Sequence, residues 1–296
     1  MMFRQTLLLA GQNFSGWHRN ARIWMTFALG LVMCFMLTDQ MIGRAQIYNS
    51  SVQIFEPFIW TFGDAQSVML SSVLLLVLFA DMPFTGQEAP YCLIRTTRKI
   101  WLMGQVLYVI SAVVIYNVFL FAVEALIALP WAYPGNVWSA SSAALAYGAG
   151  ENAALPVSLK TMESSTPFEC MALVFLLMLL YSLFIAAFML FLNLSAGGAA
   201  GVIGAILMNL YGYLLNPEFF MKIFEIPRGA AYRANILCGW LSPLNHATFP
   251  MHGFGYDYLP RIYVSAALFA VGIGILTGFS MGRMKKYNFE FQQVEE

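Results

Sequence analysis

Long apolar runs alternate with shorter polar connections along this chain, and the lengths of the runs predict its elements. A helix needs roughly 17–25 residues to cross a bilayer. Runs that meet or approach this length cover about residues 21–38, 59–80, 102–129, 171–194, 196–215 and 262–281. The second run begins at residue 65 instead if Asp64 is excluded. The pattern predicts an all-α polytopic membrane protein with six transmembrane helices, which form one transmembrane domain over residues 1–296.

The first twenty residues are more polar than the runs that follow, but apolar side chains recur among them. These are Phe3, Leu7, Leu8, Phe14 and Trp17. Such a mixture predicts an amphipathic helix over residues 1–20 that lies in the membrane interface. A plain polar tail is the alternative interpretation.

The distribution of positive charge indicates the orientation of the predicted spans. Connections that hold basic residues at high density lie on the cytoplasmic side of a membrane. With both termini inside, the inner side carries Arg4, Arg19, Arg22, Arg95, Arg98, Lys99, Arg283, Lys285 and Lys286. The outer side carries Arg44, Lys160, Lys222, Arg228, Arg233 and Arg261, spread over much longer segments. The charge density favours cytoplasmic N- and C-termini.

Composition agrees with a membrane location and excludes several functional classes. The chain is 60% hydrophobic and 10% charged, whereas an average soluble domain is roughly 25% charged. Its net charge of zero provides no basic field for nucleic acid. The motifs GxxxxGK[ST], HExxH and GxSxG do not occur. We therefore expect no enzymatic activity in this chain, and no cofactor or metal bound by it.

Cysteines and histidines in the predicted outer segments leave two questions open. Cys170 and Cys238 both fall outside, where they either form a disulfide or remain separate thiols. His246, His252 and Asp257 are candidate metal ligands, but their spacing matches no standard site. Loop structure explains the two histidines better than a metal does.

The connection from Asp81 to Trp101, DMPFTGQEAPYCLIRTTRKIW, is the densest basic segment between the two chain ends. Pro90 suits the first turn of a helix. Arg95, Arg98 and Lys99 then share one face of it because they are spaced i, i+3 and i+4. The segment predicts a short helix at the membrane surface. A basic loop that only fixes topology is the alternative.

Small residues mark the fifth and sixth predicted spans. Gly197, Gly201 and Gly204 open the fifth, and Gly274 and Gly278 belong to a GxxxGxxxG ladder in the sixth. Small residues allow helices to approach closely in lipid. The pattern predicts tight helix packing, either within one chain or between two chains.

Glu124 is the only carboxylate well inside a predicted span. Charge in a bilayer costs roughly 2.5–3.5 kcal/mol on insertion scales, so a function is the default hypothesis for such a residue. Its place six residues before Pro130, near the outer end, also fits a charge that faces an outer vestibule.

Two pairs of local motifs resemble a known family. DMPF followed by LIRTTRKIWLMGQ, and SPLNHATF followed by FGYDYLP, are similar to ABC-2 type permeases of ABC transporters, in particular an uncharacterised group from Gram-positive bacteria. The resemblance in topology covers essentially the whole chain, whereas only these motifs are specific.

The resemblance implies a permease subunit in a bacterial plasma membrane, working as an exporter of a peptide, lipid or hydrophobic drug-like substrate. ATP and Mg²⁺ would bind to a separate ATP-binding subunit dimer, and a second permease, identical or homologous, would complete the channel. The connection between the second and third spans would be the coupling helix, with Glu88, Tyr91, Arg95 and Arg98 contacting the ATPase. The fifth span would help to form the dimer seam. A secondary transporter or channel driven by an ion gradient is the alternative function.

Overall fold

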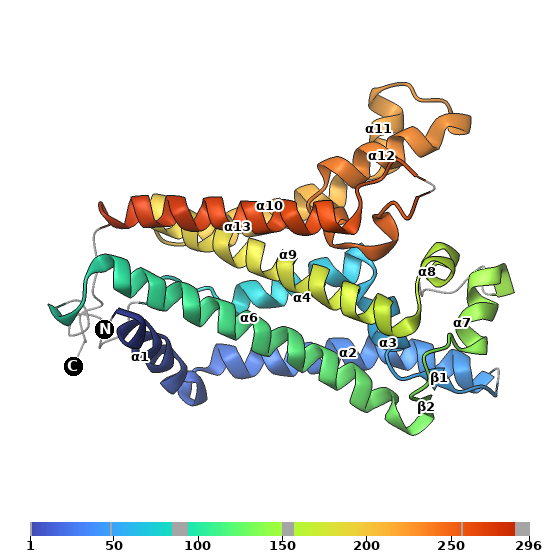
Figure 1. Cartoon of the computed structure of the whole chain (residues 1–296), viewed down its shortest axis with the longest axis horizontal. Coiled ribbons are helices and arrows are strands. Elements are labelled where there is room, and N and C mark those ends of the chain that lie inside the picture. Colours follow the sequence, from blue (N-terminus) through green and yellow to red (C-terminus); the bar gives the residue numbers. More distant parts are fainter. Residues whose placement is uncertain (1, 48, 85–93, 150–156, 256, 288–296) are drawn as a thin grey trace.

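Long helices lie side by side along the long axis of the molecule (Figure 1). The computed structural model describes residues 2–47, 49–84, 94–149, 157–255 and 257–287. Within these residues, four helices are long and apolar enough to cross a membrane. They are α2 (Ala21–Ile47), α6 (Arg98–Ala128), α9 (Pro167–Ala196) and α13 (Ile262–Met284). The prediction of a helical membrane protein is confirmed at this level.

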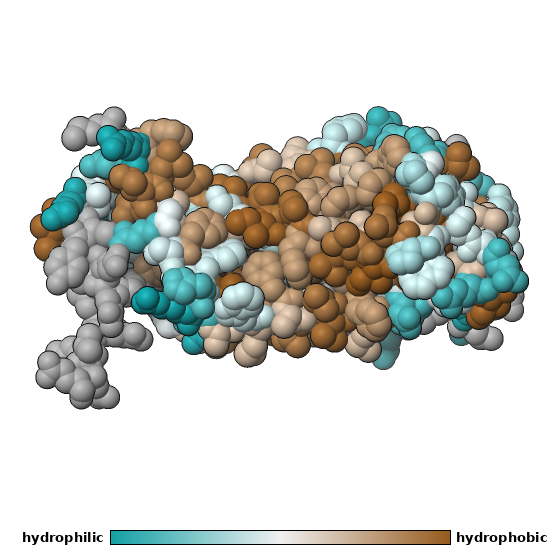
Figure 2. All heavy atoms as spheres, turned by 90° about the horizontal axis from the view of Figure 1, so that it is seen from below, coloured by the Kyte–Doolittle hydropathy of each residue, from teal (hydrophilic) through white to brown (hydrophobic). Residues whose placement is uncertain are grey.

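Apolar residues gather across the middle of the face shown in Figure 2, and polar residues gather toward its two ends. Large apolar side chains of α2 contribute to the exposed surface, among them Trp24, Phe35 and Met36. Contiguous exposed apolar surface of this kind is unusual for a soluble monomer. The surface is therefore compatible with a location in a membrane.

The second predicted span is bent. The chain does not form one helix over residues 59–80 but α3 (Glu56–Phe62) and α4 (Ala65–Leu78), which meet at 83°. The alternative start at residue 65 matches the start of α4. Asp64 begins the second helix as its N-cap, because its side chain accepts a hydrogen bond from Gln66 N at 3.0 Å. The bent pair brings the number of candidate spans to at most five.

The fifth predicted span, residues 196–215, corresponds to α10 (Ala200–Leu214). With 15 residues it is shorter than a helix normally needs to cross a bilayer. It packs against α9 and α4.

The N-terminal segment forms a helix, α1 (Met2–Ser15), followed by the short η1 (Trp17–Arg19). Helix α1 packs closely against α6, where a Cβ atom on Gly104 would lie 2.7 Å from the Cβ of Leu9. The predicted helix over this segment is confirmed. Phe3 and Leu8 are exposed on it, as an interfacial helix requires.

The end of the bundle opposite α1 carries the short elements (Figure 1). Strand β1 (Val52–Gln53) pairs in parallel with β2 (Ala132–Tyr133), with Val52 opposite Ala132. The remaining elements are η2 (Leu129–Trp131), α7 (Ala140–Ala144), η3 (Leu145–Ala149), α8 (Leu159–Ser164), α11 (Pro217–Ile223), η4 (Arg228–Ala230), α12 (Ala231–Leu241), η5 (Asn245–Ala247) and η6 (Phe249–Met251). Helices α11 and α12 enclose a small core of their own, formed by Phe220, Ala234 and Cys238.

Candidate functional site

The segment predicted to couple to an ATPase is described only at its two ends. Residues 85–93 lie outside the described residues, and so do the predicted contacts Glu88 and Tyr91. We call residues 81–84 the entry root of this segment and residues 94–99 its exit root. Both roots lie at the end of the bundle that also holds α1 (Figure 1).

The entry root is bonded to three helices. The side chain of Asp81 forms an ion pair with Arg22 of α2. The carbonyl oxygen of Met82 accepts a hydrogen bond of 2.7 Å from Asn193 Nδ2 of α9. Both backbone groups of Phe84 bond to the side-chain amide of Gln105 in α6, at 3.3 Å and 3.4 Å. Because the ion pair is about half exposed, the bonds from the two amides hold this root more strongly.

Asn193 extends this connection to a fourth helix. Its Oδ1 accepts a 2.6 Å hydrogen bond from the backbone N–H of Gly201, in the first turn of α10. The side chain is buried, with 1% exposed. One amide therefore ties the end of α9, the start of α10 and the entry root together.

Aromatic packing joins the same root to the N-terminal helix. The ring of Phe84 lies 4.8 Å from that of Tyr108 in α6, and Tyr108 lies 4.8 Å from Phe14 in α1. Trp17 Nε1 donates a 2.8 Å hydrogen bond to the hydroxyl of Tyr108. The oxygen of a neutral phenol can accept this hydrogen bond.

The exit root is bonded to the last helix of the bundle. Arg98 Nη1 donates to the carbonyl oxygens of Met284, Lys285 and Tyr287, at 3.4, 3.0 and 3.1 Å. A cation at the C-terminus of a helix satisfies unpaired carbonyls and opposes the negative end of the helix dipole. The guanidinium predicted to contact an ATPase therefore holds the end of α13 in this structure.

Three other residues of the exit root have different surroundings from Arg98. Ile94 is 83% exposed and Arg95 is also exposed. Thr97 is the N-cap of α6, since its side chain accepts a 3.4 Å hydrogen bond from Ile100 N. Arg95 is thus an exposed predicted contact; Arg98 is exposed as well, but its guanidinium is bonded to the end of α13.

The predicted glycines divide into two groups. A Cβ on Gly201 would lie 2.5 Å from Asn193 Oδ1, and one on Gly204 would lie 2.1 Å from a methyl carbon of Leu192. These two glycines pack α10 against α9 within the chain. Gly197 has a φ of 75° and ends α9 instead.

Gly274 and Gly278 lie on an open face of α13. A Cβ on either residue would meet no atom of the described chain within 4 Å. Close packing by these two glycines within the chain is therefore not observed, and their face is open to lipid or to another subunit.

Glu124 is fully buried between α2 and α6, where its Oε2 accepts a hydrogen bond from the hydroxyl of Thr38. It faces the interior of the bundle in this structure and does not line an open vestibule. Small and polar residues recur at intervals of four on the buried side of α2, which is the side that faces Glu124. They are Thr26, Gly30, Cys34 and Thr38. This spacing is visible in the sequence and marks one face of α2, but it does not identify Glu124 as the residue that this face meets.

His246 and His252, which were candidate metal ligands, meet at one hydroxyl. His246 Nδ1 and His252 Nε2 lie 2.8 and 2.9 Å from Ser265 Oγ, in the first turn of α13. Burial lowers the pKa of His246 and lowers the pKa of His252 to about 4. Asp257 pairs with Lys160 instead, at 2.5 Å. This arrangement agrees with loop structure, and no group of three metal-ligating side chains occurs in the described ranges.

The three cysteines in the described residues, Cys34, Cys170 and Cys238, are buried and free. The proposed disulfide between the second and third of these is therefore not formed in the structure.

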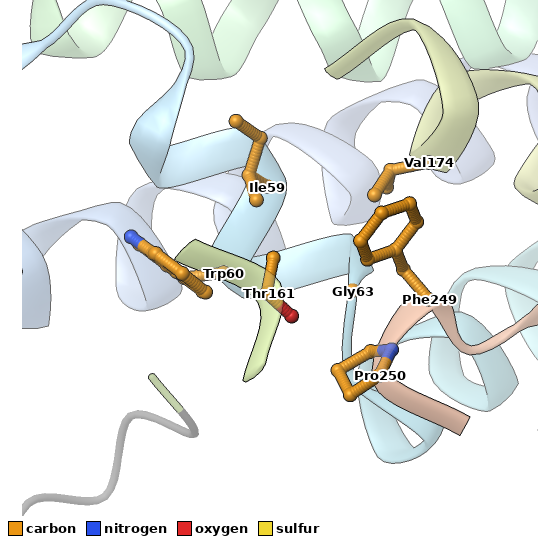
Figure 3. A pocket seen from close by; sticks show the side chains of 7 residues that line it. All are labelled: Ile59, Trp60, Gly63, Thr161, Val174, Phe249 and Pro250. Atoms are coloured by element: carbon orange, nitrogen blue, oxygen red, sulfur yellow. The ribbon is translucent and has the colours of Figure 1, made fainter. Parts of the chain in front are cut away.

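A small cavity lies between α3, α8, α9 and η6 (Figure 3). Its lining is mainly apolar: Ile59, Trp60, Gly63, Thr161, Val174, Phe249 and Pro250. The hydroxyl of Thr161 is buried without a hydrogen-bond partner. The cavity holds about 10 Å³, which is of the order that one water molecule needs. It is too small for an organic substrate.

Comparison with protein-family models, curated proteins and solved structures gave no match. The resemblance to ABC-2 permeases consequently rests on the sequence motifs alone.

Proposed function

We propose that this chain is the membrane-spanning permease subunit of an ATP-driven ABC transporter of the ABC-2 type. In this proposal it has six spans and two cytoplasmic termini, and it exports a peptide, a lipid or a hydrophobic drug-like molecule across a bacterial plasma membrane. A dimer of separate ATP-binding subunits binds ATP and Mg²⁺. A second permease subunit, identical or homologous, completes the pathway.

The observation that carries this proposal is the way both roots of one short connection are bonded to the bundle. The entry root is bonded to α2, α6 and α9, and Asn193 links it to α10. The exit root begins α6 and is bonded to the end of α13. A displacement of this connection would therefore act on five helices of the bundle at once.

Such an arrangement suits a subunit whose helices must respond to a motor outside the membrane. A partner can shift a conformational equilibrium only through differential contacts with the two states. Directional hydrogen bonds at both roots would pass a movement of residues 85–93 into helix tilt, whereas a slack loop would absorb it. The exposed Arg95 supplies a charged contact at the same place.

The test uses Arg95→Glu in the full-length chain, expressed together with an ABC-type ATP-binding subunit from the same organism, for which a neighbouring reading frame with Walker motifs is the first candidate. We expect the substitution to abolish co-purification and the permease-dependent change in ATP turnover, because it reverses the charge at the docking surface. Thermal stability should not change, since Arg95 is exposed. Arg228→Glu is the matched control, because Arg228 is an exposed arginine of η4, among the elements at the other end of the bundle.

Arg98 requires a separate interpretation. Arg98→Gln should lower stability by releasing the end of α13, so its effect on ATP turnover mixes docking with folding. Undiminished co-purification and unchanged ATP turnover with Arg95→Glu would contradict the proposal.

A secondary transporter or channel driven by an ion gradient is the second candidate, and the buried Glu124 favours it. Intramembrane carboxylates frequently serve proton or ion pathways. Transport by the purified chain alone, driven by an imposed gradient without ATP and abolished by Glu124→Gln, would support this second function.

A further inference from the structure

Glu124 lies where a carboxyl group has no access to water. Its side chain is fully buried, as are its neighbours Cys34 and Thr38 on α2. Thr61 of α3 also lies beside the carboxyl group and is 3% exposed. The carboxyl group is therefore enclosed by three helices: α2, α3 and α6 (Figure 1 shows the helices).

The hydrogen bonds of Glu124 are too few for a carboxylate. A carboxylate offers about four acceptor positions on its two oxygens. Oε2 accepts one bond from the hydroxyl of Thr38, and Oε1 has no hydrogen-bond partner. The nearby thiol of Cys34 is directed to the carbonyl oxygen of Leu120, at 3.9 Å.

Among the described residues, no positively charged side chain pairs with Glu124. The ion pairs within the described residues are Arg22–Asp81 and Lys160–Asp257, and neither includes Glu124. The titratable side chain that faces the carboxyl group is Cys34, which is itself next to Tyr116. The facing groups on α3 and on the rest of α2 are the neutral hydroxyls of Thr61 and Thr38.

Glu56, the other buried glutamate among the described residues, shows what a satisfied carboxyl group looks like in this fold. Its Oε1 accepts a 2.6 Å hydrogen bond from Ser139 N, and its Oε2 accepts a 3.2 Å bond from Gln53 N. Both oxygens therefore have a backbone donor, and Glu56 joins the start of α3 to the chain before α7. Glu124 makes no such bond to a backbone N–H and has one orphan oxygen.

We propose that Glu124 is a proton-binding site: its carboxyl group takes up one proton from the solvent as the bundle folds around it, and it then holds this proton as a neutral acid at neutral pH. An isolated buried charge is far less stable than the neutral group, so protonation is the response that the surroundings require. The bond to Thr38 is kept, because a hydroxyl and a carboxylic acid can each donate or accept. The site exists whether the chain is coupled to an ATPase or not.

The experiment is infrared spectroscopy of the full-length chain in lipid nanodiscs at neutral pH, with glutamate labelled by ¹³C. A protonated carboxyl group has a C=O stretching band that is separate from the carboxylate bands and shifts in D₂O. We expect one ¹³C-sensitive band of this kind to be absent from Glu124→Gln and present in the matched control Glu56→Gln. The band should also be lost when the bundle is unfolded at neutral pH, since exposed glutamate ionises there.

Thr38→Val keeps the test decisive if Glu124→Gln does not fold. Removal of the hydroxyl should shift the band, because the C=O group loses its hydrogen-bond partner, but the band should remain. Absence of any protonated glutamate band in the wild-type protein, or a band unaffected by both Glu124→Gln and Thr38→Val, would overturn the proposal.

Discussion

Replacement of Asn193 by leucine would remove the amide that joins the entry root, α9 and α10. Leucine has a similar shape, so the substitution deletes the hydrogen bonds and leaves little empty space. Two backbone groups would lose their partners: the carbonyl oxygen of Met82 and the N–H of Gly201. Water could not easily replace the amide, because the side chain of Asn193 is 1% exposed.

The structure sets the expected size of this effect. Each buried polar group left without a partner costs about 1–3 kcal/mol, so the two groups together cost roughly 2–6 kcal/mol. The apolar leucine recovers part of this, which leaves a loss of about 3 kcal/mol in the free energy of unfolding. At 2–4 °C per kcal/mol, Tm should fall by roughly 6–12 °C.

The assay is thermal unfolding in one detergent, followed by tryptophan fluorescence, together with hydrogen exchange of the peptide that contains Gly201. The amide of Gly201 should exchange faster in Asn193→Leu, because its acceptor has been removed. Ser111→Ala is the matched control, since the hydroxyl of Ser111 bonds only to the carbonyl of Leu107 in its own helix. A fall in Tm no larger than that of the control, with unchanged exchange at Gly201, would refute this account of the entry root.

Two further predictions concern packing and pH. Gly201→Ala should lower the free energy of unfolding by about 1–3 kcal/mol, because the added Cβ would lie 2.6 Å from the carbonyl oxygen of Met189. In Gly274→Ala the added Cβ meets no described atom within 4 Å, so the free energy of unfolding should stay unchanged or rise by up to about 1 kcal/mol. Thermal unfolding of the two variants side by side checks this, and equal losses would contradict it. Neutral His252 should contribute its full share to the free energy of unfolding above about pH 6.5. As the pH falls from there toward the folded pKa of about 4, the free energy of unfolding should decrease by about 3 kcal/mol, because the unfolded state binds the proton first. His252→Gln should flatten the dependence of Tm on pH in this window, and an unchanged slope would argue against it.

Hydropathy predicted the apolar runs well but not the ends or bends of the helices. The predicted span over residues 21–38 ends where the apolar run ends, before Asp39. Helix α2 itself continues to Ile47, through Asp39 and Arg44. Charged residues can continue a helix outside the hydrocarbon, so their presence ends a span without ending the helix. At residues 63–64 the opposite occurs, since Asp64 begins a new helix inside an apolar run.

The residues that hold the two roots were harder to predict for a different physical reason. Asn193, Gln105 and Arg98 bond to backbone groups of distant segments. Every residue carries a backbone carbonyl, so nothing in the sequence marks the particular carbonyls that are chosen. The position of Glu124 in an apolar run was predictable, but its partner Thr38 lies 86 residues away and depends on the packing of α2 against α6.

The neighbouring helices α9 and α10 differ in length by a factor of two. With 30 and 15 residues and a rise of 1.5 Å per residue, they are about 45 Å and about 22 Å long. A hydrocarbon core is about 30 Å thick, so α10 falls roughly 8 Å short of it. If both helices cross the membrane, the bilayer must be thinner beside α10 than beside α9, or the chain ends of α10 must sink below the headgroups. The lipid around this protein would then be deformed on one side only.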